Sequence, residues 1–217
     1  MKKLTFFSLF FLSYHFANAQ TVGLRAFVNF ANWSSSDPAL TQIGATLNNA
    51  TGFGVAVPLE IKLSDRFSLQ PEVMYIQKGS SLSFAVGNVV ATGKTLISHL
   101  ELPILLKVNL LGSESPVGIG IIAGPSFAYA LSGTTTASAS GQTNSQSNDF
   151  TFKDYQRFEV GAHLGLNVGF GIGSGKLVFD ARYLLGISDL NTGPNSTSSN
   201  SVRNRGISVG LGYVFSL

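Results

Sequence analysis

The 217-residue chain contains no cysteine, which excludes disulfides and thiolate metal sites. Charged residues make up only 12% of it, against roughly 25% in an ordinary soluble domain, whereas glycine and phenylalanine number 24 and 17. Low charge with many aromatic side chains suits surroundings other than water, and the length allows one β domain of ordinary size or two small domains.

The first 19 residues have the pattern of a secretory signal peptide. Two lysines precede a mostly apolar run over 4–16, and Ala17-Asn18-Ala19 forms a small-residue cleavage site. The run is shorter than the roughly 20 residues that a membrane-spanning helix needs. Because the chain has no cysteine, a lipid anchor on that residue is excluded. We therefore predict a signal peptide over 1–19 and a single mature domain over 20–217.

The charge of the mature chain is almost balanced. Removing the two signal-peptide lysines leaves twelve basic against eleven acidic residues, so the high isoelectric point comes in part from the targeting segment. The chain also has no run of basic residues that could follow a phosphate backbone. These observations argue against nucleic acid as a partner.

Eight segments of the mature chain alternate with period 2 between apolar residues and small or polar residues, which is the pattern of strands with two unlike faces. None of them has a convincing amphipathic helix pattern. They cover about 21–32, 51–63, 67–78, 95–110, 117–131, 157–172, 176–186 and 206–217.

The connections between these segments alternate in length. Those after the second, fourth and sixth segments are short, and the other connections are longer, near 33–50, 79–94, 132–154 and 188–204. The low-complexity stretch 132–141 is rich in Ser and Thr, as mobile loops are. An even strand count, short turns at one end and long polar loops at the other are typical of a transmembrane β-barrel with periplasmic turns. Both termini are then expected to be periplasmic.

Nearly every charge within these strands lies on the face with small residues. An Arg or Lys facing lipid near the midplane costs about 2–4 kcal/mol, so the apolar face is expected outside and the charged face inside. Eight strands leave a lumen just wide enough to be filled by side chains. We predict a structural lumen charge network formed by Arg25, Glu60, Lys62, Glu72, Lys78, His99, Glu101, Lys107, Glu159, His163, Asp180 and Arg182.

The last segment, 206–217, is expected to close the barrel by pairing antiparallel with 22–30. Its apolar residues should face lipid, so a charge at Leu211 should block insertion, whereas Ser208 on the inner face should tolerate change. Aromatic residues near the strand ends are predicted to form the girdles of such a barrel. These are Tyr75, Phe127, Tyr129, Phe158, Tyr183, Tyr213 and Phe215.

Two pairs on the inner face could in principle act as general acid and base. They are His99 with Glu101 and His163 with Glu159, with Ser126 or Ser208 as nucleophile. The alternative is a hydrogen-bonded lumen network, which we favour because no sequence context of a nucleophile surrounds either serine. The glycine-rich stretch 169–173 has no Lys-Ser/Thr after it and is interpreted as packing. We predict no catalytic residue, no cofactor and no metal site.

Four blocks of the sequence resemble those of the PorT-like outer-membrane β-barrel family of Bacteroidota. The most specific are LQPEVMYIQKG over 69–79 and LELPILLK over 100–107. The others are GLRAFVNFA over 23–31 and ARYLLGISDL over 181–190. Leu100 replaces a frequent aromatic residue of the family, and the chain ends in Leu217 where many outer-membrane barrels end in Phe.

The resemblance implies an eight-stranded antiparallel up-and-down barrel in the outer membrane of a Gram-negative bacterium. Most members of the family have no assigned role, so the resemblance implies location and fold but no activity. We expect a non-enzymatic, monomeric envelope protein with a structural role or a binding role of its surface loops, surrounded by outer-membrane lipid. The alternatives are an accessory of a secretion or transport assembly that binds an envelope protein through its loops, a small pore, and an enzyme in the lumen.

Overall fold

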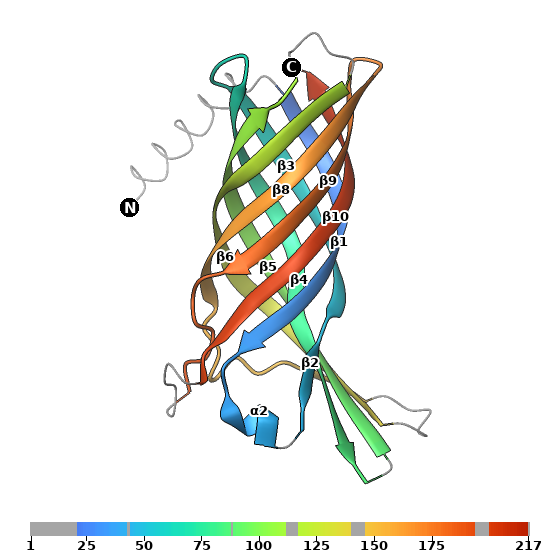
Figure 1. Ribbon diagram of the computed structural model, residues 1–217, viewed down its shortest axis with the longest axis vertical. Coiled ribbons are helices and arrows are strands. Elements are labelled where there is room, and N and C mark those ends of the chain that lie inside the picture. Colours follow the sequence, from blue (N-terminus) through green and yellow to red (C-terminus); the bar gives the residue numbers. More distant parts are fainter. Residues whose placement is uncertain are drawn as a thin grey trace, which may run out of the picture.

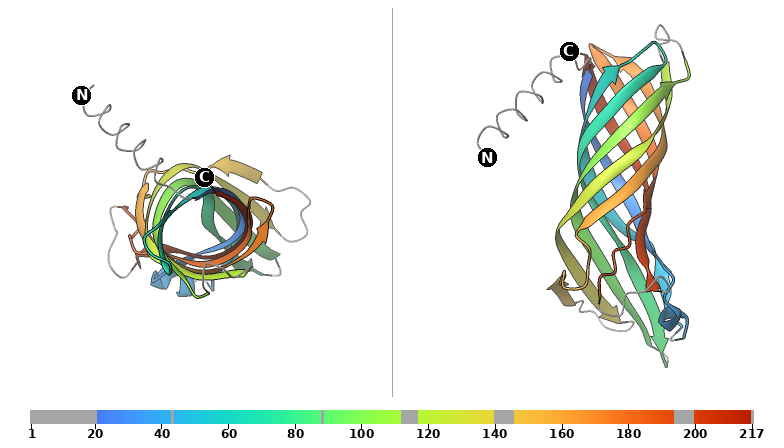
Figure 2. Two further views of the ribbon diagram at one scale, coloured as in Figure 1. Left: turned by 90° about the horizontal axis from the view of Figure 1, so that it is seen from above. Right: turned by 90° about the vertical axis from the view of Figure 1, so that its left-hand side faces the viewer.

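The computed structural model describes residues 21–42, 44–87, 89–111, 117–139, 146–193 and 200–216. Eight antiparallel strands close into a ring (Figures 1 and 2), as predicted. In ring order they are β1 (Thr21–Ser35), β3 (Ala50–Lys62), β4 (Phe67–Val86), β5 (Val89–Asn109), β6 (Val117–Ala139), β8 (Phe158–Ile172), β9 (Gly175–Gly186) and β10 (Val202–Ser216). The predicted signal peptide lies outside the described residues.

The ring is closed by β1 and β10, the first and last strands. They pair antiparallel from Thr21 opposite Ser216 to Ser35 opposite Val202. Every backbone group of a lipid-facing strand needs a partner within the protein, and a closed ring supplies these partners without leaving an edge. The predicted pairing of the closing strand is therefore confirmed.

Alternation along each strand separates two environments. In β1 every second side chain from Gly23 to Ala31 is buried, and the residues between them are exposed. The exposed set is apolar, with Leu24, Leu164 and Leu166 exposed by 60%, 57% and 55%. The buried set contains the charged residues together with a small apolar cluster that includes Phe27, Met74 and Leu184. The charges are thus inside and the outer wall is apolar, as a hydrocarbon environment requires.

The two ends of the barrel differ. At the upper end in Figure 1 the strands are joined by short turns, such as 63–66 between β3 and β4 and Gly173-Ser174 between β8 and β9. Thr21 and Ser216 also lie at this end, because Thr21 is opposite both Ser216 and Glu60, and Glu60 lies just before the 63–66 turn. The long connections gather at the opposite end (Figure 1). We call this opposite end the loop end.

The predicted loop at 79–94 is wrong. These residues extend β4 and β5 as one hairpin, paired without interruption from Gly79 opposite Leu96 to Val86 opposite Val89. The pairing leaves only two positions between Val86 and Val89, and Gly87 there has a φ of 61°, a conformation open to glycine at little cost. A Gly-Asn dipeptide between alternating residues is a hairpin signal, so the sequence did contain the information.

Further β structure flanks this hairpin. The stretch 132–139, predicted as a mobile loop, is instead the end of β6, and β7 (Gln146–Asp149) pairs with it. The short β2 (Thr46–Asn48) pairs with β4 on the other side. Threonine is favoured in strands, and neighbouring strands satisfy the backbone here. The barrel wall thus continues beyond the ring as a sheet in the order β2-β4-β5-β6-β7, which Figure 1 shows at its lower right.

The remaining loop-end structure is a single helical turn, α2 (Pro38–Gln42), between β1 and β2. Among the described residues, no helix is both long and apolar enough to cross a membrane.

Candidate functional site: the lumen network and the barrel mouth

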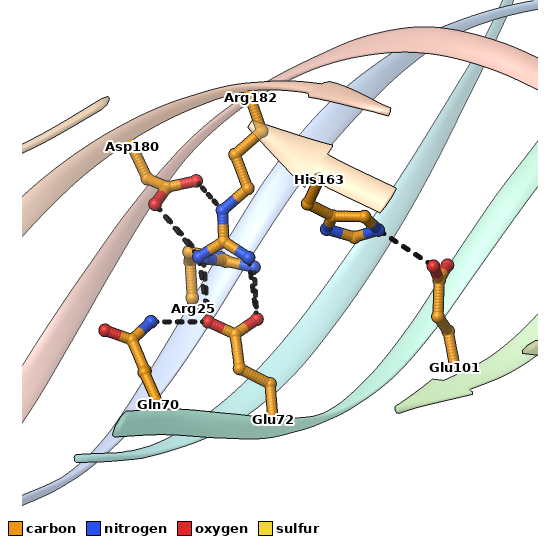
Figure 3. Close-up of polar contacts among 7 residues, drawn as sticks. All are labelled: Arg25, Gln70, Glu72, Glu101, His163, Asp180 and Arg182. Carbon is orange, nitrogen blue, oxygen red and sulfur yellow. Dashed lines mark hydrogen bonds and ion pairs between the residues drawn. The ribbon is translucent and has the colours of Figure 1, made fainter. Parts of the chain in front are cut away.

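Four charged residues form the first group of the lumen network. Arg182 donates to Glu72 through both terminal nitrogens, at 2.9 and 2.8 Å, and Arg25 Nη2 lies 2.9 Å from the same carboxylate. Asp180 binds both arginines, with Oδ1 2.7 Å from Arg182 Nε and Oδ2 3.2 Å from Arg25 Nη1. All four side chains are almost fully buried. Figure 3 shows the two guanidinium groups between the two carboxylates.

This group is neutral and comes from three strands far apart in the sequence. Burying a charge is costly unless it is paired and its remaining hydrogen-bonding positions are filled. Two bases meet two acids here, and Gln70 Nε2 adds a hydrogen bond of 2.6 Å to Glu72 Oε1. Arg25 also lies over the ring of Phe27, 5.3 Å from its centre. The arrangement fills the cross-section with a rigid network.

A second group lies nearer the loop end. Lys78 Nζ is 3.1 Å from both Glu101 Oε2 and Glu159 Oε2. His163 Nε2 is 2.8 Å from Glu101 Oε1, and Asn204 Nδ2 donates to Glu159 over 3.0 Å. Neither acid–base pair considered from the sequence is formed, because Glu101 meets His163 rather than His99 and Glu159 meets Lys78 and Asn204.

The geometry around Glu101 does not assemble a nucleophile. The imidazole of His163 contacts Glu101 through Nε2, and its Nδ1 has no hydrogen-bond partner in the described part of the chain, so neither ring nitrogen meets a serine hydroxyl. A base that activates a serine must contact its hydroxyl. Among the described residues, no group of three or more His, Asp or Glu side chains could hold a metal ion.

The other predicted members lie at the edges of the network. Lys107 pairs with Glu60 at 2.9 Å, and both are partly exposed. Lys62 lies apart from the network, at the short-turn end, where its side chain is 38% exposed and pairs with Asp65 at 3.3 Å. The parity of Lys62 is that of the inner face, but its strand ends at this residue, so water reaches the ammonium group.

Little space is left between these groups. A cavity of about 30 Å³ lies beside Arg25 and Asp180, and one of about 10 Å³ lies between Lys78, Glu101 and His163. A wider cavity of about 190 Å³ borders the short-turn end, near Lys107 and Lys176. The charged side chains therefore occupy the middle of the barrel.

An aromatic cluster lies at the loop end, next to the inward-facing His99. The rings of Phe150, Phe152 and Tyr155 pack edge to face, with centres 5.1 to 5.8 Å apart. Arg157 lies over Phe152, 4.1 Å from the ring centre. Burial raises the pKa of Tyr155 above its usual range, so its hydroxyl stays protonated; it faces His99 Nε2 at 3.5 Å. Because His99 Nδ1 donates to the Ile97 carbonyl, its Nε2 is free to accept.

The sequence matches the family model described as Outer membrane protein beta-barrel domain over residues 10–192. The chain belongs to this family. It is a small outer-membrane β-barrel protein, and its exposed apolar wall is the surface that contacts lipid. A search of the curated proteins found no match.

Solved structures with a similar fold come from several bacteria. Ail, the attachment invasion locus protein of Yersinia pestis, is 14% identical with a TM-score of 0.43, and the alignment covers 91% of this chain and 99% of Ail. Neisserial surface protein A is 14% identical with a TM-score of 0.41, covering 90% and 97%. A major outer membrane protein from Thermus thermophilus is 11% identical with a TM-score of 0.44, covering 88% and 99%.

Several residues of this outer-membrane barrel that complete the site were missed from the sequence. Gln70 and Asn204 share the inner face with the charges they bind, so their parity was an available signal. Tyr155 lies between the predicted loop 132–154 and the strand predicted from about 157, where no periodicity marks a side chain as buried. Its place above His99 depends on the folding of the loop end.

Proposed function

We propose that this outer-membrane barrel is a non-enzymatic, monomeric envelope protein that acts by binding at its loop end, with a closed lumen as rigid support. The observation that carries the proposal is the sheet β2-β4-β5-β6-β7, which continues the barrel wall beyond the ring. Binding residues are often carried by loops on a rigid scaffold, and here the connections themselves form paired strands. The short-turn end, with both termini, is assigned to the periplasm and the loop end to the cell exterior.

The lumen network supports a non-enzymatic, non-conducting role. Except for His99, its buried acids and bases are engaged in ion pairs at 2.7 to 3.2 Å. A carboxylate or imidazole held in this way stabilises the barrel and has no space beside it for a substrate. The resemblance of the 69–79 and 100–107 blocks supports the further proposal that this chain is one of the PorT-like barrels of Bacteroidota.

A second candidate is an accessory of a secretion or transport assembly, bound to another envelope protein. The tip of the β4–β5 hairpin favours it, because Val89 and Val90 are exposed by 44% and 47% at the loop end. Apolar side chains at the tip of a protruding hairpin offer a contact to a protein partner.

The test is a cross-linked pull-down from the native envelope with a shortened hairpin. Removing Ala85, Val86, Val89 and Val90 deletes two cross-strand pairs and leaves Gly87-Asn88 to join Phe84 and Ala91, which are already partners. We expect the variant to insert normally and to lose its partner. A variant with Val89→Thr and Val90→Thr keeps the hairpin length and removes the apolar surface of its tip. Loss of the partner in this variant assigns the contact to the apolar side chains, and retention assigns it to the shape of the hairpin. A partner that is retained by the shortened hairpin would exclude this surface.

A further inference from the structure

A cleft of about 370 Å³ opens at the loop end, beside the aromatic cluster. Small-molecule sites in proteins have volumes of about 300–1,000 Å³ and occur in the mouths of β-barrels. Four segments contribute to its walls: the end of β1, the loop before β8, the loop after β9 and the start of β10. Its lining includes Trp33, Phe150, Lys153, Asp154, Tyr155 and Leu190.

Hydrogen bonds between these segments fix the shape of the cleft. The Gln156 amide donates to the Leu190 carbonyl over 2.9 Å, and the Leu190 amide donates to the Val202 carbonyl over 2.8 Å. Asp189 Oδ1 accepts from the amides of Asn191 and Val202, at 3.0 and 2.9 Å. Leu190 itself is only 1% exposed. A site held in this way is largely formed before a ligand arrives, which reduces the entropic cost of binding.

The walls combine aromatic rings with a few polar groups. Trp33 is on the lumen side of β1, because it pairs with the inward-facing Asn204, and Tyr155 and Phe150 lie beside each other. The indole Nε1 of Trp33 is buried without a hydrogen-bond partner among the described residues. A buried donor without an acceptor costs free energy. Because Trp33 lines the cleft, a small shift of the indole ring on binding brings this N–H to an oxygen of a ligand.

The charges of the lining select the class of ligand. Lys153 and Asp154 are adjacent and opposite in sign, so the cleft has no net charge that would favour an anion or a cation. A hydrocarbon chain would offer no hydrogen-bond partner to Lys153, to Asp154 or to the indole N–H. A pyranose ring matches all of these features: its C–H face packs on aromatic rings, and its hydroxyl groups donate to a carboxylate and accept from an ammonium group and an indole N–H.

We propose that this cleft binds a neutral saccharide unit of a glycan presented outside the cell. The proposal deepens the proposed function, on which it rests, because it names the ligand class of the loop end. Aromatic faces orient the sugar ring, Asp154 and Lys153 bind its hydroxyl groups, and Trp33 forms the wall on the barrel side. The bonded loops, rather than a moving lid, define the shape that the ring must fit.

The chain provides its own reporter, since Trp33 is its single tryptophan. The full mature chain is placed in lipid nanodiscs and titrated with neutral oligosaccharides of glucose, mannose and N-acetylglucosamine. Oligogalacturonate and an alkyl alcohol serve as the anionic and apolar probes. We expect a saturable change of tryptophan emission with at least one neutral series and none with the other two probes. A response only to the anionic or apolar probe, or no response to any neutral series at millimolar concentration, overturns the proposal.

Two variants test the assigned contacts. Asp154→Ala removes one acceptor and should weaken saccharide binding about tenfold, the effect of losing one hydrogen bond to a charged group. Asp65→Asn, at the opposite end of the barrel, is the matched control and should bind as the unmodified protein does. Equal binding by the Asp154 variant would overturn the assigned site.

Trp33→Phe keeps an aromatic face and removes the N–H, so calorimetry should show weaker binding with the same stoichiometry. If Asp154→Ala does not fold, as judged by its gel mobility, Trp33→Phe is the variant that tests the site. Unchanged affinity in Trp33→Phe would then contradict the proposal. The hairpin pull-down is independent of both variants. If the shortened hairpin loses its partner and no saccharide binds, the proposed function stands and only this inference is wrong.

Discussion

Arg182 and Glu72, 110 residues apart in the sequence, form a two-point ion pair across the lumen, with Nη1–Oε2 at 2.9 Å and Nη2–Oε1 at 2.8 Å. Neither side chain is measurably exposed. Glu72 also binds Arg25, so one carboxylate holds two guanidinium groups that belong to β1 and β9. This relationship predicts which substitutions the barrel tolerates.

Glu72→Gln should be strongly destabilising. It removes one of the two acids that neutralise Arg25 and Arg182, and breaking a buried ion pair by removing one partner costs about 3–5 kcal/mol. Urea unfolding in lipid vesicles, followed by the heat-dependent shift in gel mobility, measures the loss. The control is Glu60→Gln, whose pair with Lys107 is partly exposed and should cost no more than about 1 kcal/mol. Equal losses in the two variants would contradict a central role of Glu72.

The side chains of the same network should determine conductance. The unmodified protein is expected to stay at baseline in a planar bilayer, because the cavities beside the network are only about 30 and 10 Å³. Replacing Arg25, Glu72 and Arg182 with serine clears only one level of the lumen, because Lys78 remains paired with Glu101 and Glu159. A measurable ion path should therefore open only when these three residues are replaced with serine as well. Alanine at Lys62 and Asp65, an exposed pair at the short-turn end, should leave the baseline unchanged. Channel activity of the unmodified protein would show that the lumen is open.

Leu211→Arg should impair insertion, because this side chain is 46% exposed on the apolar wall. An arginine on the lipid face costs about 2–4 kcal/mol at the midplane and less toward the interfaces. Ser208→Ala is the matched change on the inner face of the same strand, where Ser208 is 4% exposed, and should insert normally. Outer-membrane fractionation with the gel-mobility assay distinguishes them. The reverse outcome would require the two faces of β10 to be exchanged.

Gly54→Ala tests the packing inside the wall. A Cβ at Gly54 would overlap the ring of Phe27 and lie 2.6 Å from the Tyr75 carbonyl oxygen. The ring can shift but the backbone cannot, so we expect a loss of about 1–3 kcal/mol, typical of overpacking. Gly93→Ala is the control, since no atom lies within 4 Å of its added Cβ. Unfolding in urea should show a clear difference between the two variants, and equal stability would contradict the close contact.

The sequence predicted the site in part. Parity alone identified the inward-facing side of Arg25, Glu72, Glu101 and Arg182, but it could not say which acid meets which base. Partners depend on how far each strand is shifted along its neighbour, and that shift is set by the closure of the ring. His163 was considered from the sequence as a partner of Glu159, but in the structure it contacts Glu101 at 2.8 Å.

The sequence by itself determined the ring, its two faces and its closure by 206–217, since lipid outside and charge inside impose a period-2 pattern on every spanning strand. Beyond the membrane no lipid imposes that pattern, so β structure in 79–94 and 132–139 was marked only by a Gly-Asn turn and threonine content. Only the tertiary structure decided the ion-pair partners, the continued sheet and the cleft beside Trp33. Each of these depends on contacts between segments far apart in the chain, which local periodicity does not encode.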